Sequence, residues 1–220
     1  MSHLDNPFRL PRTVLPSRYE VSLEPNLDTA TFTGSVIITS EVTASCSEIV
    51  LNAIELDIAS VTVNGAPASF TLHEESERLI IAASPAVGPC TIQISFTGIL
   101  NDKLRGFYRS TFTDDSGVVR TIATTQMQST DCRRAFPCFD EPDFKAVFAI
   151  DLTIKSEFLA VSNSSETRRE ENANGTTRIW FADTMIMSTY LVAFVVGPLE
   201  ATEPQMVGDI AVRVIHVPGK

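Results

Sequence analysis

Apolar and polar residues alternate with a period of two along most of this chain, which is typical of β-strands that bury one face. The clearest case spans residues 90–100, where apolar side chains take one side and polar side chains take the other. The apolar side holds Ile92, Ile94 and Phe96, and the polar side holds Thr91, Gln93, Ser95 and Thr97. No helical period is sustained over three turns. Many short strands separated by turns predict an all-β fold, either a large antiparallel β-sandwich or a curved open sheet.

The same pattern predicts strands along the rest of the chain. They cover residues 18–24, 32–42, 47–51, 56–63, 68–72, 78–82, 118–125, 148–155, 160–162, 177–181, 190–196 and 210–214. Asn64-Gly65 predicts a tight hairpin turn, and the polar residues 166–175 predict a hairpin tip. Residues 1–16 contain three prolines and are expected to form an extended arm. Because no internal boundary stands out, we predict one β domain over residues 1–220.

Composition narrows the class of protein. Hydrophobic residues make up 44% of the 220 residues, which is enough for a large core and excludes disorder. The formal net charge of −10 argues against nucleic acid or an anionic membrane as a partner. No apolar run approaches the roughly 20 residues that span a membrane. The first seven residues lack the basic and apolar regions of a secretory signal, so we expect a cytoplasmic protein.

Cysteine and histidine are the first candidates for metal ligands. The spacing of Cys46, Cys90, Cys132 and Cys138 is not of a metal-binding type, so reduced thiols are expected. Cys132 and Cys138 flank a tight turn, which leaves a disulfide between them open. His73 begins a sequence like the zinc motif H-E-x-x-H, but the fifth residue is Glu77. We therefore predict no metal site and no catalytic residue in this chain.

The densest polar stretch covers residues 124–145. If its first residues are extended, Gln126 and Gln128 project to one side and Met127 to the other. Pro137 limits any helix there to about a turn, so a strand end should lead into a tightly folded loop. The charged residues are expected to support this loop through salt bridges; they are Asp131, Arg133, Arg134, Asp140 and Glu141. Judged by residue type alone, two such glutamines more often form hydrogen bonds to backbone groups in a bend than bind a ligand.

The sequence Thr-Gln-Met-Gln-Ser-Thr-Asp-Cys-Arg-Arg-Ala-Phe-Pro-Cys-Phe-Asp-Glu-Pro, residues 125–142, closely resembles a signature of known enzymes. These are the zinc aminopeptidases of the aminopeptidase N and puromycin-sensitive type, which carry it in their N-terminal β domain. The opening residues 10–34 and the segment 106–110 resemble the same domain more loosely. The resemblance implies that Gln126 helps to bind the first side chain of a peptide substrate. It also implies that Gln128 grips the free α-amino group, where many members have Glu.

The resemblance further implies a full-length enzyme that uses Zn²⁺ to remove single residues from peptide N-termini. The motif H-E-x-x-H and the substrate motif Gly-x-Met-Glu-Asn are both absent from this chain. We therefore expect a substrate-binding front domain that is inactive alone, with a thermolysin-like catalytic domain, not present in this chain, as its partner. An alternative is a non-catalytic scaffold, or a peptide-binding β module of the same architecture.

Overall fold

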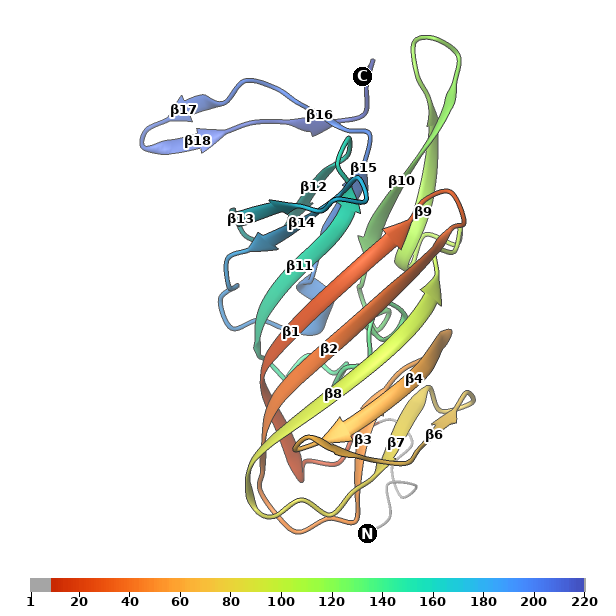
Figure 1. Cartoon of the computed structure of the whole chain (residues 1–220). Helices are drawn as coiled ribbons and strands as arrows, with labels where there is room; N and C mark the ends of the chain where they lie inside the picture. The colour runs from red at the N-terminus through yellow and green to blue at the C-terminus, as the bar shows by residue number, and fades with distance from the viewer. Residues whose placement is uncertain (1–8, 220) are drawn as a thin grey trace.

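A computed structural model describes residues 9–219, which form two layers of strands and two short 3-10 helices (Figure 1). The first layer is one eight-stranded sheet with the order β13-β14-β11-β1-β2-β8-β4-β5. Its strands are β1 (Val14–Asn26), β2 (Thr31–Val42), β4 (Leu56–Val63), β5 (Ala66–Pro67), β8 (Gly88–Ile99), β11 (Val147–Lys155), β13 (Glu166–Glu171) and β14 (Thr176–Phe181).

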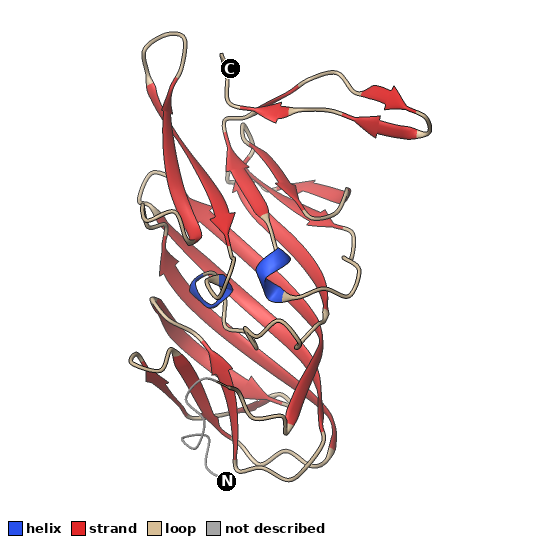
Figure 2. Cartoon of the chain, turned by 180° about the vertical axis from the view of Figure 1, so that it is seen from behind, coloured by secondary structure: helices blue, strands red, loops and turns tan. Residues whose placement is uncertain are grey.

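The second layer consists of two smaller sheets that face the large one. A four-stranded sheet has the order β12-β15-β10-β9, and a three-stranded sheet has the order β3-β7-β6. Their strands are β3 (Glu48–Asn52), β6 (Phe70–His73), β7 (Arg78–Ala82), β9 (Gly106–Thr113), β10 (Val119–Gln126), β12 (Leu159–Ser162) and β15 (Phe194–Gly197). Seen from behind, the helices η2 (Cys132–Arg134) and η3 (Thr189–Leu191) lie over the middle of the large sheet (Figure 2). The predicted all-β sandwich is therefore confirmed.

The C-terminal strands form an arm that projects from the body of the molecule (Figure 1). Two short antiparallel pairs build it, β16 with β19 and β17 with β18. Their bounds are Glu200–Ala201 for β16, Gln205–Val207 for β17, Ile210–Val212 for β18 and Ile215–His216 for β19. Every residue of β17 and β18 is exposed.

Aromatic side chains join the two layers. The ring of Phe32 on β2 lies 5.2 Å from that of Phe107 on β9, which in turn lies 4.9 Å from that of Phe194 on β15. Within the large sheet, Tyr19 on β1 stacks on Phe148 of the neighbouring β11 at 4.8 Å. All five rings are almost completely buried. The inward positions of the alternating segments therefore form one core, as the period of two predicts.

One pairing departs from a purely antiparallel sheet. β1 and β11 run parallel, with Arg18 opposite Val147. Parallel neighbours need a long crossover connection, and here about 120 residues lie between the two strands. The last part of this connection crosses the inner face of the large sheet and carries the two glutamines.

Three local predictions are wrong. The arm expected over residues 1–16 ends earlier, because β1 already begins at Val14 and bulges between Pro16 and Arg18; residues 1–8 lie outside the described residues. The polar segment 166–175 is not all hairpin tip, because Glu166–Glu171 forms the edge strand β13. Its side chains are all exposed, so no apolar alternation marks it.

The third correction concerns residues 190–196, where only Phe194–Gly197 is a strand. The preceding Thr189–Leu191 is a 3-10 helix. The side chain of Asn163 accepts a hydrogen bond from Ala193 N and donates one to Leu191 O. Those bonds satisfy backbone groups that a strand would pair with a neighbour.

Candidate functional site

The two glutamines follow directly from β10. Gln126 is its last residue, opposite Gly106 of β9. Gln126 and Gln128 are exposed, whereas Met127 between them is 2% exposed. The expected alternation is thus confirmed, and the peptide bond after Gln128 is cis. Among residues 9–219, neither glutamine side chain makes a hydrogen bond, so neither satisfies a backbone group in the bend.

The residues 126–146, called the Gln loop below, fold tightly against the core. The single turn of η2 fits the predicted limit on helix length. Beyond it, Cys138 forms an isolated antiparallel bridge with Asn52 at the end of β3, with N–O distances of 2.8 and 3.1 Å. Phe139 N donates to the buried Tyr19 hydroxyl at 3.1 Å. The loop is therefore anchored to both layers of the sandwich.

Arg133 is the centre of a largely buried ionic group in this loop. Its Nε donates to Asp140 Oδ2 at 3.0 Å, and its Nη1 lies 2.8 Å from Glu77 Oε2. Thr189 Oγ1 of η3 donates to the other Asp140 oxygen at 2.6 Å. The Asp140 side chain is only 1% exposed, and both of its oxygens have partners, so its charge is compensated.

Arg134 makes a second group of ion pairs. Its Nε donates to Asp131 Oδ1 at 2.7 Å, and its Nη1 lies 2.8 Å from Glu55 Oε2. A Cβ on Gly106, whose φ is +66°, would lie 2.6 Å from Arg134 Cβ, so only glycine leaves room for this side chain. The predicted salt bridges of the loop are confirmed. Glu55, a partner outside the loop, could not be inferred from sequence spacing.

The N-terminal segment also binds this loop. Glu141 accepts hydrogen bonds from Arg9 Nε at 2.8 Å and from Leu10 N. A cavity of about 770 Å³ lies between this segment, the β6–β7 turn and the Gln loop. Its lining includes His73, Thr130 and Arg133, but neither glutamine. The exposed glutamines thus lie outside this cavity.

All four cysteines are free thiols, so no disulfide joins Cys132 and Cys138. Both side chains are completely buried. Burial raises the pKa of the Cys132 thiol well above its usual value and raises the pKa of the Cys138 thiol as well. Their sulfur atoms and a carboxylate oxygen of Asp140 all lie within 4.8 Å of one another.

We predict that a thiol reagent will separate these cysteines by reactivity. In the native chain Cys46, which is partly exposed, should react at least about tenfold faster than Cys132 or Cys138, whose thiols are buried and protonated. Peptide mass spectrometry after brief alkylation with a maleimide measures this. Equal labelling of all three would contradict the buried positions, and full labelling in urea is the control.

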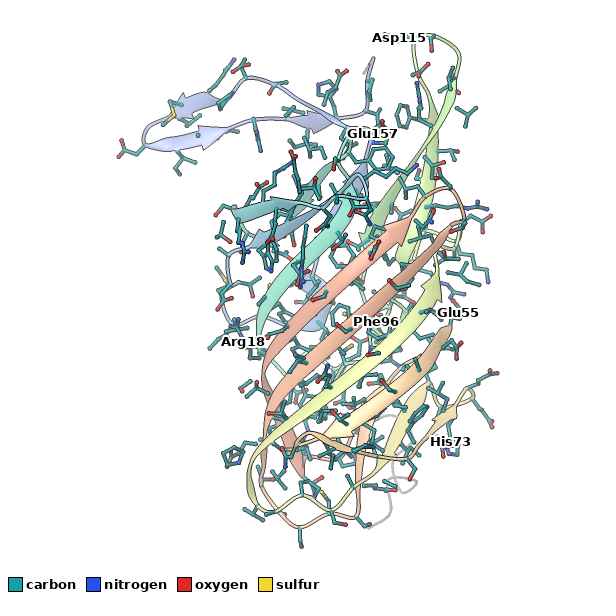
Figure 3. The ribbon with its side chains drawn as sticks, viewed as in Figure 1. Arg18, Glu55, His73, Phe96, Asp115 and Glu157 are labelled. Atoms are coloured by element: carbon teal, nitrogen blue, oxygen red, sulfur yellow. The ribbon has the colours of Figure 1, made fainter. Side chains whose placement is uncertain are left out.

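The two histidines among residues 9–219 lie in different sheets. His73 lies in β6 toward one end of the molecule, far from the tip that carries Asp115 (Figure 3). His216 belongs to β19 in the projecting arm, and His3 lies outside the described residues. In the described part of the chain, no histidine belongs to a cluster of potential metal ligands. Nor does that part contain a helix long and apolar enough to cross a membrane.

The all-β sandwich agrees with the class of protein that comparisons with known proteins show, the N-terminal domain of an aminopeptidase. The Peptidase M1 N-terminal domain model matches residues 15–191. The chain belongs to the peptidase M1 family.

The similar proteins are named as aminopeptidases. Aminopeptidase M1-A of Oryza sativa subsp. japonica is 43% identical over an alignment of 224 residues that covers 96% of this chain and 25% of that protein. Alanine/arginine aminopeptidase of Saccharomyces cerevisiae is 39% identical over 218 residues, with the same coverage. Aminopeptidase 2, mitochondrial, from the same yeast is 38% identical and is covered to 23%. The chain thus spans about a quarter of the length of these relatives, and its cytoplasmic location stays a prediction.

Proposed function

We propose that this chain is the substrate-binding front domain of a zinc aminopeptidase that removes single residues from peptide N-termini. One observation carries the proposal. Gln126 and Gln128 are exposed, on either side of the buried Met127, in a loop that ion pairs and the Asn52–Cys138 bridge anchor to the core. Polar groups that an anchored loop presents, and that have no hydrogen-bond partner among residues 9–219, are suited to hold a ligand.

The chemistry of the two side chains supports different roles. The amide oxygen of Gln128 accepts a hydrogen bond from a substrate α-ammonium group, which has three donors. A neutral acceptor attracts this cation less than a carboxylate does, so the rest of the charge must be met by carboxylates outside this chain. Gln126 contacts the first side chain of the peptide. An ammonium group held at a fixed place positions the first peptide bond for cleavage.

The residues of this chain do not fit a catalytic zinc ion, since the described histidines lie on separate sheets and no H-E-x-x-H motif is present. We propose that a downstream catalytic domain holds the metal and that residues 1–220 act as one β domain beside it. The projecting arm supports this arrangement. It exposes Met206, Val207 and Ile210, each at more than 60%, to a partner that would cover them.

The test is hydrolysis of an aminoacyl chromogenic substrate by the 220-residue chain, with and without added Zn²⁺. We expect no turnover in either case, because the residues that activate water are absent. Zinc-dependent turnover by this chain would contradict the proposal. The matched measurement uses a protein that carries this chain together with its downstream domain, which should hydrolyse the same substrate but not its N-acetyl derivative.

A further inference from the structure

We propose that Cys132, Cys138 and Asp140 form a binding site for a thiophilic divalent cation of the Zn²⁺ type. Two thiol sulfurs and a carboxylate oxygen meet here in the interior, within 4.8 Å of one another. Sulfur and carboxylate ligands of this kind are those that Zn²⁺ and Cd²⁺ bind in proteins. This inference does not rest on the proposed function of the glutamines.

The spacing of the ligands is close to that of a tetrahedral site. With metal–sulfur bonds of about 2.3 Å, two sulfur ligands of zinc lie about 3.8 Å apart. The two sulfur atoms lie at most 4.8 Å apart in the structure, so they need to approach each other by at most about 1 Å. Small rotations of the two cysteine side chains would bring them together. Cys132 is held by η2, and Cys138 is fixed by its backbone bridge to Asn52. The fourth position is left to a water molecule.

The carboxylate is already oriented by a second set of contacts. Arg133 and Thr189 each donate to a different oxygen of Asp140, at 3.0 and 2.6 Å. Arg133 N also donates to Oδ2, at 3.3 Å, so Oδ1 is the oxygen that keeps a lone pair available to a cation. Hydrogen bonds to a ligating carboxylate from outside the coordination shell are a regular feature of protein metal sites.

The charge of the buried group also suits a divalent ion. Without metal, two neutral thiols lie beside the Asp140 carboxylate and the Arg133 guanidinium, which also pairs with the Glu77 carboxylate. Binding forms two metal–sulfur bonds and releases both thiol protons to solvent. Because two protons leave as one dication enters, the net charge of the group does not change on binding. Neither state leaves an uncompensated charge in the core.

A route to the site passes through the 770 Å³ cavity beside the Gln loop. Arg133 lines this cavity and also donates to Asp140, so its side chain links the cavity to the group of ligands. Five residues lie between the two cysteines, a spacing that gave no metal prediction. The fold brings Asp140 next to the two cysteines. A bound ion would stabilise the Gln loop on the C-terminal side of Gln128.

The test is a titration of the reduced, metal-free 220-residue chain with Cd²⁺. We expect one equivalent to bind, with a sulfur-to-cadmium absorption band in the near ultraviolet and a rise in Tm. Cys132→Ser and Cys138→Ser should each weaken binding at least about tenfold. The matched control is Cys46→Ser, which changes a cysteine outside the group and should bind as the original chain does.

A second measurement covers the case in which the serine variants do not fold. In mild urea, Zn²⁺ should slow alkylation of Cys132 and Cys138 but not of Cys46 in the unchanged chain, and a chelator should reverse this. Three outcomes would overturn the proposal. They are the absence of the absorption band, alkylation rates unaffected by Zn²⁺, and protection that only a reducing agent reverses, which would indicate a disulfide.

Discussion

Replacing Gln128 by alanine in a protein that carries this chain and its catalytic domain should lower kcat/KM for peptide substrates by about 10- to 150-fold. That range corresponds to a hydrogen bond to a charged group, worth about 1.5–3 kcal/mol. The loss should include a higher KM, because the contact holds the substrate α-ammonium group before and during reaction. Steady-state kinetics with aminoacyl chromogenic substrates measure both constants.

Two further variants make this prediction specific. Gln128→Glu should lower KM, because a carboxylate attracts the ammonium group more strongly than an amide does. Gln93→Ala changes an exposed glutamine on the outer face of the large sheet and should leave both constants unchanged. If kcat/KM of Gln128→Ala equals that of the unchanged enzyme, Gln128 does not belong to the substrate site.

Asp140→Ala should lower the free energy of unfolding by about 3 kcal/mol, since it leaves the largely buried Arg133 without its inner partner. The hydroxyl of Thr189 loses its acceptor at the same time. Urea unfolding of the 220-residue chain, followed through the fluorescence of its single tryptophan, Trp180, measures the loss.

The matched control lies three residues further along the chain. Asp143 forms ion pairs with Arg9 and Arg12, but its side chain is 55% exposed. Asp143→Ala should therefore change the free energy of unfolding by no more than about 1 kcal/mol. Equal losses in the two aspartate variants would show that burial of the Arg133–Asp140 pair adds nothing to stability.

The sequence predicts strands well where one face is buried and the other exposed. Residues 90–100 alternate because one face of β8 packs on the core and the other is in water. The strand predicted over these residues is therefore present in the structure. The same rule misses β13, since an edge strand with all side chains exposed carries no apolar signal. The rule also predicts a strand from Tyr190, where the structure has a 3-10 helix. Apolar alternation does not reveal the hydrogen bonds by which the Asn163 side chain satisfies the backbone there.

In the candidate site, too, the sequence predicts local features but not long-range contacts. The common orientation of Gln126 and Gln128 follows from local periodicity alone. Their proposed roles came from the family resemblance, since two exposed glutamines identify no ligand by themselves. Glu55 and Glu77 pair with loop arginines from more than 50 residues away. Such contacts depend on how the sheets pack, so no spacing rule could have indicated them.

The parallel pairing of β1 with β11 has a consequence for a chain that is still being synthesised. β1, β2 and β8 can pair as soon as they emerge, but the other edge of β1 stays open until β11 follows, about 130 residues after Arg18. At about 5–20 residues per second, this interval lasts roughly 6–26 s. During that time the nascent sheet presents an unpaired edge and an uncovered apolar face, both of which favour aggregation. Newly made chains should therefore depend on chaperones more than the finished domain does.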